Sequence, residues 1–83
     1  MNEKLSDKDF FISSDFPLLA AAYTAGYVVQ VSNRSDPGRT VFSVQKDEFW
    51  DQFITEYFSR QLRVEPMAFA QAQKILKTMI YHI

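Results

Sequence analysis

A chain of 83 residues suits one small domain, and contents of 47% hydrophobic and 16% aromatic residues exclude a disordered or low-complexity chain. The absence of cysteine excludes a disulfide framework and a thiolate zinc site, and one histidine, His82, is too few for a multi-histidine metal site, so we expect no cofactor. Nine basic and ten acidic residues give a net charge of −1, which excludes phosphate binding by overall charge alone.

Domain boundaries and targeting follow from the polar and apolar stretches. Residues 1–9 are polar and are predicted to form a flexible N-terminal segment before a single compact domain over residues 10–83. The most apolar stretch, residues 16–29, is shorter than the ~20 residues needed to span a bilayer. The segment before it is acidic, whereas a secretory signal peptide has a basic start. We therefore expect a cytoplasmic protein with no membrane partner.

A strand and then a helix are expected at the start of the domain. Residues 10–12 are apolar strand formers, and the Ser-Ser-Asp run at 13–15 offers side chains suited to a helix N-cap. Pro17 suits the first helical turn because its missing N–H is not needed there, and Gly26 is typical of a helix C-terminus. This pattern predicts a helix over about residues 16–25.

Two strands joined by a turn are expected next. Residues 27–32 are β-branched and aromatic, and residues 39–45 alternate between two faces. Residues 33–38 between them are rich in turn formers and include Pro-Gly, which indicates a hairpin with more than a two-residue connection. Alternation places Phe42 and Val44 on one face, and we expect that face to pack on the core.

Helical periodicity replaces strand periodicity after residue 46. Apolar residues recur there at spacings of three and four, which predicts an amphipathic helix whose buried stripe is Trp50, Phe53, Ile54, Tyr57 and Phe58. The predicted helix begins with acidic residues and ends with Arg60 and Arg63, a distribution that favours the helix dipole.

A last helix is expected to open at Pro66, because the residue before a proline avoids helical angles. Its apolar stripe is predicted to be Ala68, Ala72, Ile75, Leu76, Met79, Ile80 and Ile83. The resulting order, β-α-β-β-α-α, predicts an α+β fold with a small three-stranded antiparallel sheet and helices on one face. We expect the other face of the sheet to be partly open to a partner.

Charge is distributed unevenly along the chain. Residues 47–56 contain four acids and no base, whereas residues 57–83 carry a local charge of +3. Basic side chains pair with phosphates, and tyrosines can stack on bases, for which Tyr27, Tyr57 and Tyr81 are the candidates. The predicted nucleic-acid-binding residues are Arg34, Arg39, Arg60, Arg63, Lys74 and Lys77. The alternative interpretation is a solvated hairpin turn that bears arginines, with Tyr27 and Tyr57 as core aromatics whose hydroxyls face water.

Catalysis is not expected. Two glycines cannot form a Gly-rich phosphate loop, and His82 would need a nucleophile and an orienting carboxylate at the end of the chain. The acids near residues 47–51 are more simply solvated side chains at a helix N-terminus. We therefore predict a non-enzymatic binding module with nucleic acid as its partner. The competing hypothesis is a protein-binding accessory or inhibitory factor that docks on a larger host or phage complex, or that forms a homodimer.

The order of short motifs resembles a known family. The relevant runs are Phe-x-Ser-Ser-Asp-x-Pro-Leu-Leu-Ala-Ala at 11–21, Gly26, Arg-Thr-Val-Phe-Ser-Val at 39–44, Leu-Arg-Val-Glu-Pro-x-x-Phe at 62–69 and Ile-Leu-Lys at 75–77. Over residues 10–81 the chain resembles a family of small uncharacterised domains, a domain of unknown function, found in bacterial and phage proteins. The resemblance implies no activity, cofactor or catalytic residue. It implies a phage or mobile-element setting, in which nucleic-acid handling and interference with a host complex are both expected roles.

Overall fold

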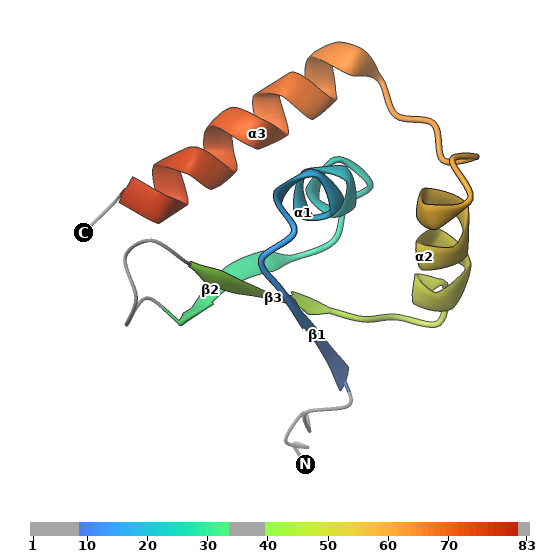
Figure 1. Ribbon diagram of the computed structural model, residues 1–83, viewed down its shortest axis with the longest axis horizontal. Helices are drawn as coiled ribbons and strands as arrows, with labels where there is room; N and C mark the ends of the chain where they lie inside the picture. The colour runs from blue at the N-terminus through green and yellow to red at the C-terminus, as the bar shows by residue number, and fades with distance from the viewer. Residues whose placement is uncertain (1–8, 34–39, 82–83) are drawn as a thin grey trace.

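A computed structural model describes residues 9–33 and 40–81 of the chain. In chain order its elements are β1 (Phe10–Ser13), α1 (Phe16–Thr24), β2 (Val29–Asn33), β3 (Val41–Gln45), α2 (Trp50–Phe58) and α3 (Pro66–Tyr81). This is the α+β order predicted from the sequence (Figure 1). Within the described ranges, no helix is both long and apolar enough to cross a membrane.

The three strands form an antiparallel sheet in the order β1-β3-β2, so β3 is the central strand. Phe11 of β1 and Val29 of β2 both lie opposite Val44, and these side chains therefore share a face. Phe42 lies on the same face and is buried together with Val44, which confirms the face expected to pack on the core. A bulge in β2 between Val31 and Asn33 shifts the register just before the strand ends.

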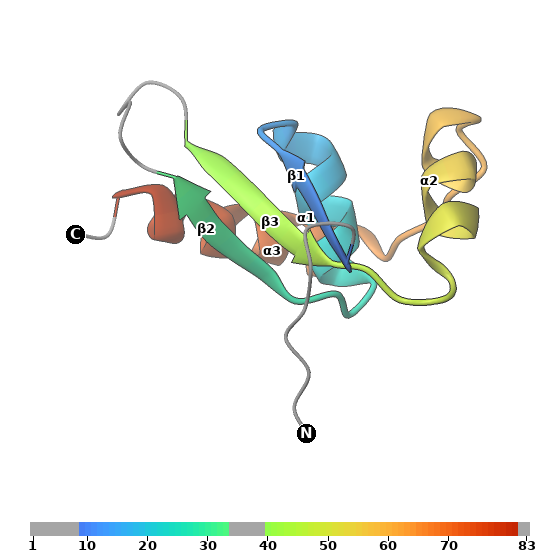
Figure 2. The same cartoon turned by 90° about the horizontal axis from the view of Figure 1, so that it is seen from below.

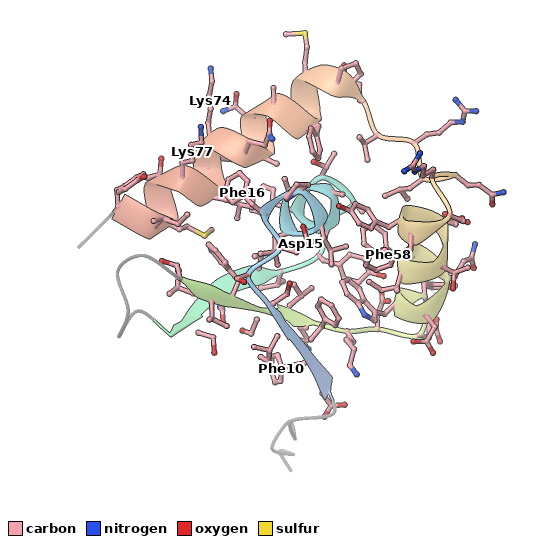
Figure 3. The ribbon with its side chains drawn as sticks, viewed as in Figure 1. Phe10, Asp15, Phe16, Phe58, Lys74 and Lys77 are labelled. Carbon is pink, nitrogen blue, oxygen red and sulfur yellow. The ribbon has the colours of Figure 1, made fainter. Side chains whose placement is uncertain are left out.

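Helix α1 lies between the sheet and α3, so the described fold has a layered core (Figures 1 and 2). The five consecutive residues 18–22 are all buried, as expected for a helix that is apolar around its whole circumference. Phe16, at the start of α1, points toward α3 (Figure 3), and Ala72 and Leu76 are the buried residues of α3. Figure 2 shows α1 and α3 on the same side of the sheet, as predicted, whereas α2 stands beyond the end of β3.

The local signals for α1 act as predicted from the sequence. Asp15 is the N-cap, and its carboxylate accepts a hydrogen bond from the Leu18 N–H at 3.3 Å. At the other end, the Tyr27 N–H donates to the Ala22 carbonyl and the Gly26 N–H to the Tyr23 carbonyl, each at 3.0 Å. This Schellman motif requires a left-handed residue, and Gly26 occupies that position with φ of +100°.

Helix α2 ends in the same motif, but with arginine in the left-handed position. The Gln61 N–H donates to the Glu56 carbonyl at 2.9 Å and the Arg60 N–H to the Tyr57 carbonyl at 3.2 Å. Arg60 has φ of +65°, a conformation that costs a residue with a Cβ roughly 1–2 kcal/mol. The predicted placement of Arg60 and Arg63 at the end of this helix is therefore wrong, because the helix ends at Phe58 and both arginines follow it.

Among the described residues, two of those assigned to apolar stripes are exposed instead, and a further one, Ile83, lies outside the described residues. Phe58 was expected in the core but is 64% exposed, because it lies about 100° around the helix from Tyr57 and falls at the margin of the stripe. Ala68 is also exposed, and Phe69 packs against the core in its place. Phe69 precedes the buried Leu76 by seven residues, a spacing that aligns the two on one side of α3.

Candidate functional site

The predicted basic residues occupy two places in the described structure. Arg60 and Arg63 lie in the connection between α2 and α3. Lys74 and Lys77 extend from the face of α3 that points away from α1 and the sheet (Figure 3). All four are exposed. Arg34 and Arg39, the remaining members of the predicted set, lie outside the described residues.

None of these four cations forms an ion pair with a carboxylate in the described ranges. Glu65, the acid between these arginines and the lysines, caps α3 instead: its two oxygens accept hydrogen bonds from the N–H groups of Met67 at 3.1 Å and Ala68 at 2.8 Å. Helix α3 itself contains no acidic residue. The charge of Arg60, Arg63, Lys74 and Lys77 is thus available to an anionic partner.

The exposed aromatic nearest to the lysines is at the end of α3. Tyr81 is 78% exposed and follows Lys77 by four residues, so it lies on the same side of the helix. Tyr27 and Tyr57, the other tyrosines considered for base stacking, are half-buried and pack against the core. Burial and the nearby Asp15 carboxylate raise the pKa of Tyr57, in that order of importance.

A second feature was not predicted: a hollow of about 390 Å³ between the C-terminal end of α1 and one face of α2. It is lined by Ala25, Gly26, Tyr27, Asp47, Phe49, Gln52, Phe53 and Glu56. Four of these residues, from Phe49 to Glu56, have spacings of three and four and so follow a single stripe of α2. The hollow therefore depends on the packing of α2 beside the turn that ends α1.

Tyr27 and Asp47, which both line the hollow, are joined by a hydrogen bond. The Tyr27 hydroxyl donates to Asp47 Oδ1 at 2.7 Å, and the same oxygen accepts the Phe49 N–H at 2.9 Å. Partial burial, then this hydrogen bond and the negative charge of Asp47, raise the pKa of Tyr27 to about 12. Farther along α2, the Gln52 side-chain amide donates to Glu56 Oε2 at 3.1 Å.

Two of the rings that line the hollow, those of Tyr27 and Phe53, pack against the buried Trp50. Trp50 is 3% exposed, and its ring centroid lies 4.9 Å from that of Tyr27 in an edge-to-face arrangement and 5.1 Å from that of Phe53 in a stacked one. Phe11 of β1 packs on the same tryptophan at 5.1 Å. By contrast Phe49, which also lines the hollow, is 59% exposed. The hollow thus combines carboxylates with accessible aromatic surface, a combination that suits a cationic group.

The sequence analysis assigned Asp47 to the helix dipole and Tyr27 either to base stacking or to the core, and so missed the bond between them. The usable signal was the run of acids without a base at 47–56, which indicates a negatively charged surface. In residues 9–33 and 40–81, no three His, Cys, Asp or Glu side chains lie close enough together to hold a metal ion.

Comparison with known proteins adds no relative to this description. No family model matches the chain, and neither a curated protein nor a solved structure matches it. The resemblance to a family of small bacterial and phage domains therefore stays a prediction.

Proposed function

We propose that this chain is a non-enzymatic binding module that binds nucleic acid through a basic surface centred on α3. The observation that carries the proposal is the shared outer face of Lys74, Lys77 and Tyr81, which are separated by three and four residues on a helix without acids. Lysine ammonium groups neutralise phosphates, and an exposed tyrosine ring offers a stacking surface for a base. The lysines and the tyrosine together provide the phosphate contact and the base contact that binding of single-stranded nucleic acid requires.

The arginines form a second basic group, separate from the lysines on α3. Arg60 and Arg63 precede α3 in the connection from α2, and both are exposed without an ion pair in the described structure. In the proposal they supply further phosphate contacts, and the two arginines that flank the predicted hairpin turn, Arg34 and Arg39, contribute likewise. Because the net charge is −1, this binding is local and depends strongly on salt.

Fluorescence anisotropy with labelled single- and double-stranded DNA and RNA tests the proposal. We expect salt-dependent binding at micromolar protein, which the double substitution Lys74→Gln/Lys77→Gln weakens. For a single strand, that substitution should also reduce the slope of log K against log salt by about 1.4. Lys46→Gln, which removes one charge from the connection between β3 and α2, is the control and should have little effect.

Tyr81→Leu separates stacking from phosphate contact. If Tyr81 stacks on a base, its loss should weaken single-strand binding about fivefold or more and leave the salt slope unchanged. The proposal fails if none of the four nucleic acids binds in a salt-dependent manner, or if Lys46→Gln weakens binding as much as the double substitution does.

A protein-binding accessory or inhibitory factor is the second candidate, and the uncovered face of the sheet favours it. A shallow hollow on that face is lined by Phe10, Ile12, Gln30, Ser32 and Ser43, and no described helix covers it (Figure 2). Ile12 is exposed there. Both outer strands, β1 and β2, also leave one edge without a described partner strand.

A homodimer formed through this face is the simplest version of the second candidate. Light scattering coupled to gel filtration should then give twice the monomer mass, and Ile12→Lys should return the protein to a monomer. A monomeric mass for the unsubstituted chain up to roughly 100 μM would contradict the homodimer. In a phage or mobile-element setting the same face would instead dock on a larger complex.

A further inference from the structure

We propose that the hollow between α1 and α2 binds the guanidinium group of an arginine side chain from a protein partner. This inference concerns a different surface from the basic face of α3, and it stands or falls independently of nucleic-acid binding. The charge of the hollow, the hydrogen bonds of its carboxylates and its exposed ring support this proposal.

The charge of the hollow selects a cation. Two carboxylates, Asp47 and Glu56, line it, and no basic side chain does. The surrounding segment, residues 47–56, adds Glu48 and Asp51 and contains no base. The resulting negative potential attracts a positively charged group and opposes the approach of phosphate. This charge complementarity points to a basic protein segment as the occupant, rather than nucleic acid.

The hydrogen bonds of the hollow hold its acceptors in place. Asp47 Oδ1 already accepts the Tyr27 hydroxyl and the Phe49 N–H, and Glu56 Oε2 accepts the Gln52 amide. Asp47 Oδ2 and Glu56 Oε1 accept no hydrogen bond within the described part of the chain. Because each carboxylate is held through its other oxygen, a bound donor costs less side-chain entropy than it would at a free carboxylate.

The exposed ring explains why arginine is favoured over lysine. More than half of the surface of Phe49 is exposed to solvent, and the rings of Tyr27 and Phe53 line the same hollow. A guanidinium is planar, so it can stack on an aromatic face while its N–H groups donate to a carboxylate, whereas an ammonium is a compact point charge. The volume of about 390 Å³ accommodates a guanidinium together with part of its aliphatic stem.

A blocked tripeptide, acetyl-Gly-Arg-Gly-amide, is the probe, and its citrulline counterpart is the neutral control of nearly the same shape. We expect the arginine peptide to shift the backbone NMR signals of residues 25–27 and 47–56 saturably, with a Kd on the order of millimolar. The fluorescence of Trp50, the single tryptophan, should change in parallel because its ring contacts Tyr27 and Phe53. The citrulline peptide should bind about tenfold more weakly, and the lysine peptide should fall between the two.

Two variants test the residues, and a third serves as the matched control. Phe49→Ala and Glu56→Gln should each weaken the arginine peptide about threefold, since they remove an exposed ring and a solvated carboxylate respectively. Glu48→Gln removes the same charge as Glu56→Gln from an exposed residue that does not line the hollow, so it should change affinity much less. Thermal unfolding of each variant confirms that the fold is intact.

Equal binding of the arginine and citrulline peptides would overturn the proposal, as would an equal effect of Glu48→Gln and Glu56→Gln. Shifts that fall outside residues 25–27 and 47–56, or no saturable shift up to about 10 mM peptide, would overturn it too. Nucleic-acid binding serves as the independent readout: Glu56→Gln should leave it unchanged. A failure at the hollow is therefore distinguishable from a failure of the basic surface.

Discussion

Helices α1 and α2 have the same length and the same hydrogen-bond motif at their C-terminal ends, yet they differ in almost everything that surrounds them. Helix α1 is packed between the sheet and α3 and buries five consecutive residues, whereas α2 buries only Trp50 and Phe53. Aliphatic packing thus encloses α1, and an aromatic cluster attaches α2 along one side. Helix α1 therefore contributes more to the stability of the fold, while α2 leaves most of its surface exposed.

The left-handed residues that follow the two helices also differ in their backbone strain. Gly26 adopts its left-handed conformation without strain, whereas Arg60 adopts it against its own preference. A glycine at position 60 would be the more stable choice, but it would lack a charged side chain. The end of α2 therefore carries an exposed cation at some cost in stability.

The largest effect should come from the core of α1. Leu19 is 0% exposed, and Leu19→Ala should lower the free energy of unfolding by about 3 kcal/mol, because it leaves a cavity where leucine packs. Phe58→Ala, at an exposed position of α2, should change it by less than about 0.5 kcal/mol. Urea unfolding followed by Trp50 fluorescence measures both. Similar losses of unfolding free energy in the two variants would contradict the greater contribution of α1 to stability.

Intermediate effects should come from substitutions at the left-handed residues that follow α1 and α2. Gly26→Ala should destabilise the protein by roughly 1–2 kcal/mol from backbone strain alone, because no neighbouring atom lies within 4 Å of the added Cβ. Arg60→Gly should act in the opposite direction and stabilise it by up to about 1 kcal/mol. Thermal unfolding would show the two opposite shifts in Tm. A loss of stability in Arg60→Gly would mean that the arginine side chain makes contacts worth more than the strain.

The smallest effect should come from the bond that ties α2 to the end of α1. Tyr27→Phe removes the hydrogen bond to Asp47 and should cost about 0.5–1 kcal/mol at neutral pH. The pKa of Tyr27 is about 12 in the folded protein against about 10 in the unfolded chain, so folding favours the neutral phenol. The stability that this preference contributes is complete below about pH 10 and is lost as the pH rises to about 12.

Unfolding free energies of the wild type and Tyr27→Phe between about pH 9 and 12 would measure this contribution. The wild type should lose more stability over that range than the variant. Asp47→Asn should reduce the difference, because it removes the negative charge that helps to keep the phenol neutral. Parallel curves for the wild type and Tyr27→Phe would contradict the coupling.

The elements whose ends are set by local chemistry were predictable from the sequence. Asp15 caps the start of α1, Gly26 follows its end, and Pro66 begins α3. These signals can be recognised because capping and proline geometry act over a few neighbouring residues. Phe58 was misassigned because helical spacing gives the angle of a side chain but not how far the neighbouring layer extends. The left-handed Arg60 could not be foreseen either, because the sequence at that point has no glycine to signal the end of a helix.

The hollow lay beyond sequence reasoning for a different reason. Its hydrogen bond joins Tyr27 and Asp47, which are 20 residues apart, and no local pattern relates their side chains. The central position of α1 did leave a signal, since residues 18–22 are apolar without interruption and such a helix is buried on all sides. Charge was the other accessible signal, because acids and bases are separated along the chain as well as between α2 and α3.

The strand order has a consequence for how the chain assembles during synthesis. Because β3 lies between β1 and β2, those two strands, which precede it in the chain, pair only with β3 among the described residues and have no ladder of their own. Residues 10–33 therefore cannot close a sheet until Val41–Gln45 has followed them. Because β3 pairs with both neighbours, sheet formation is a single cooperative event that waits for residues 41–45.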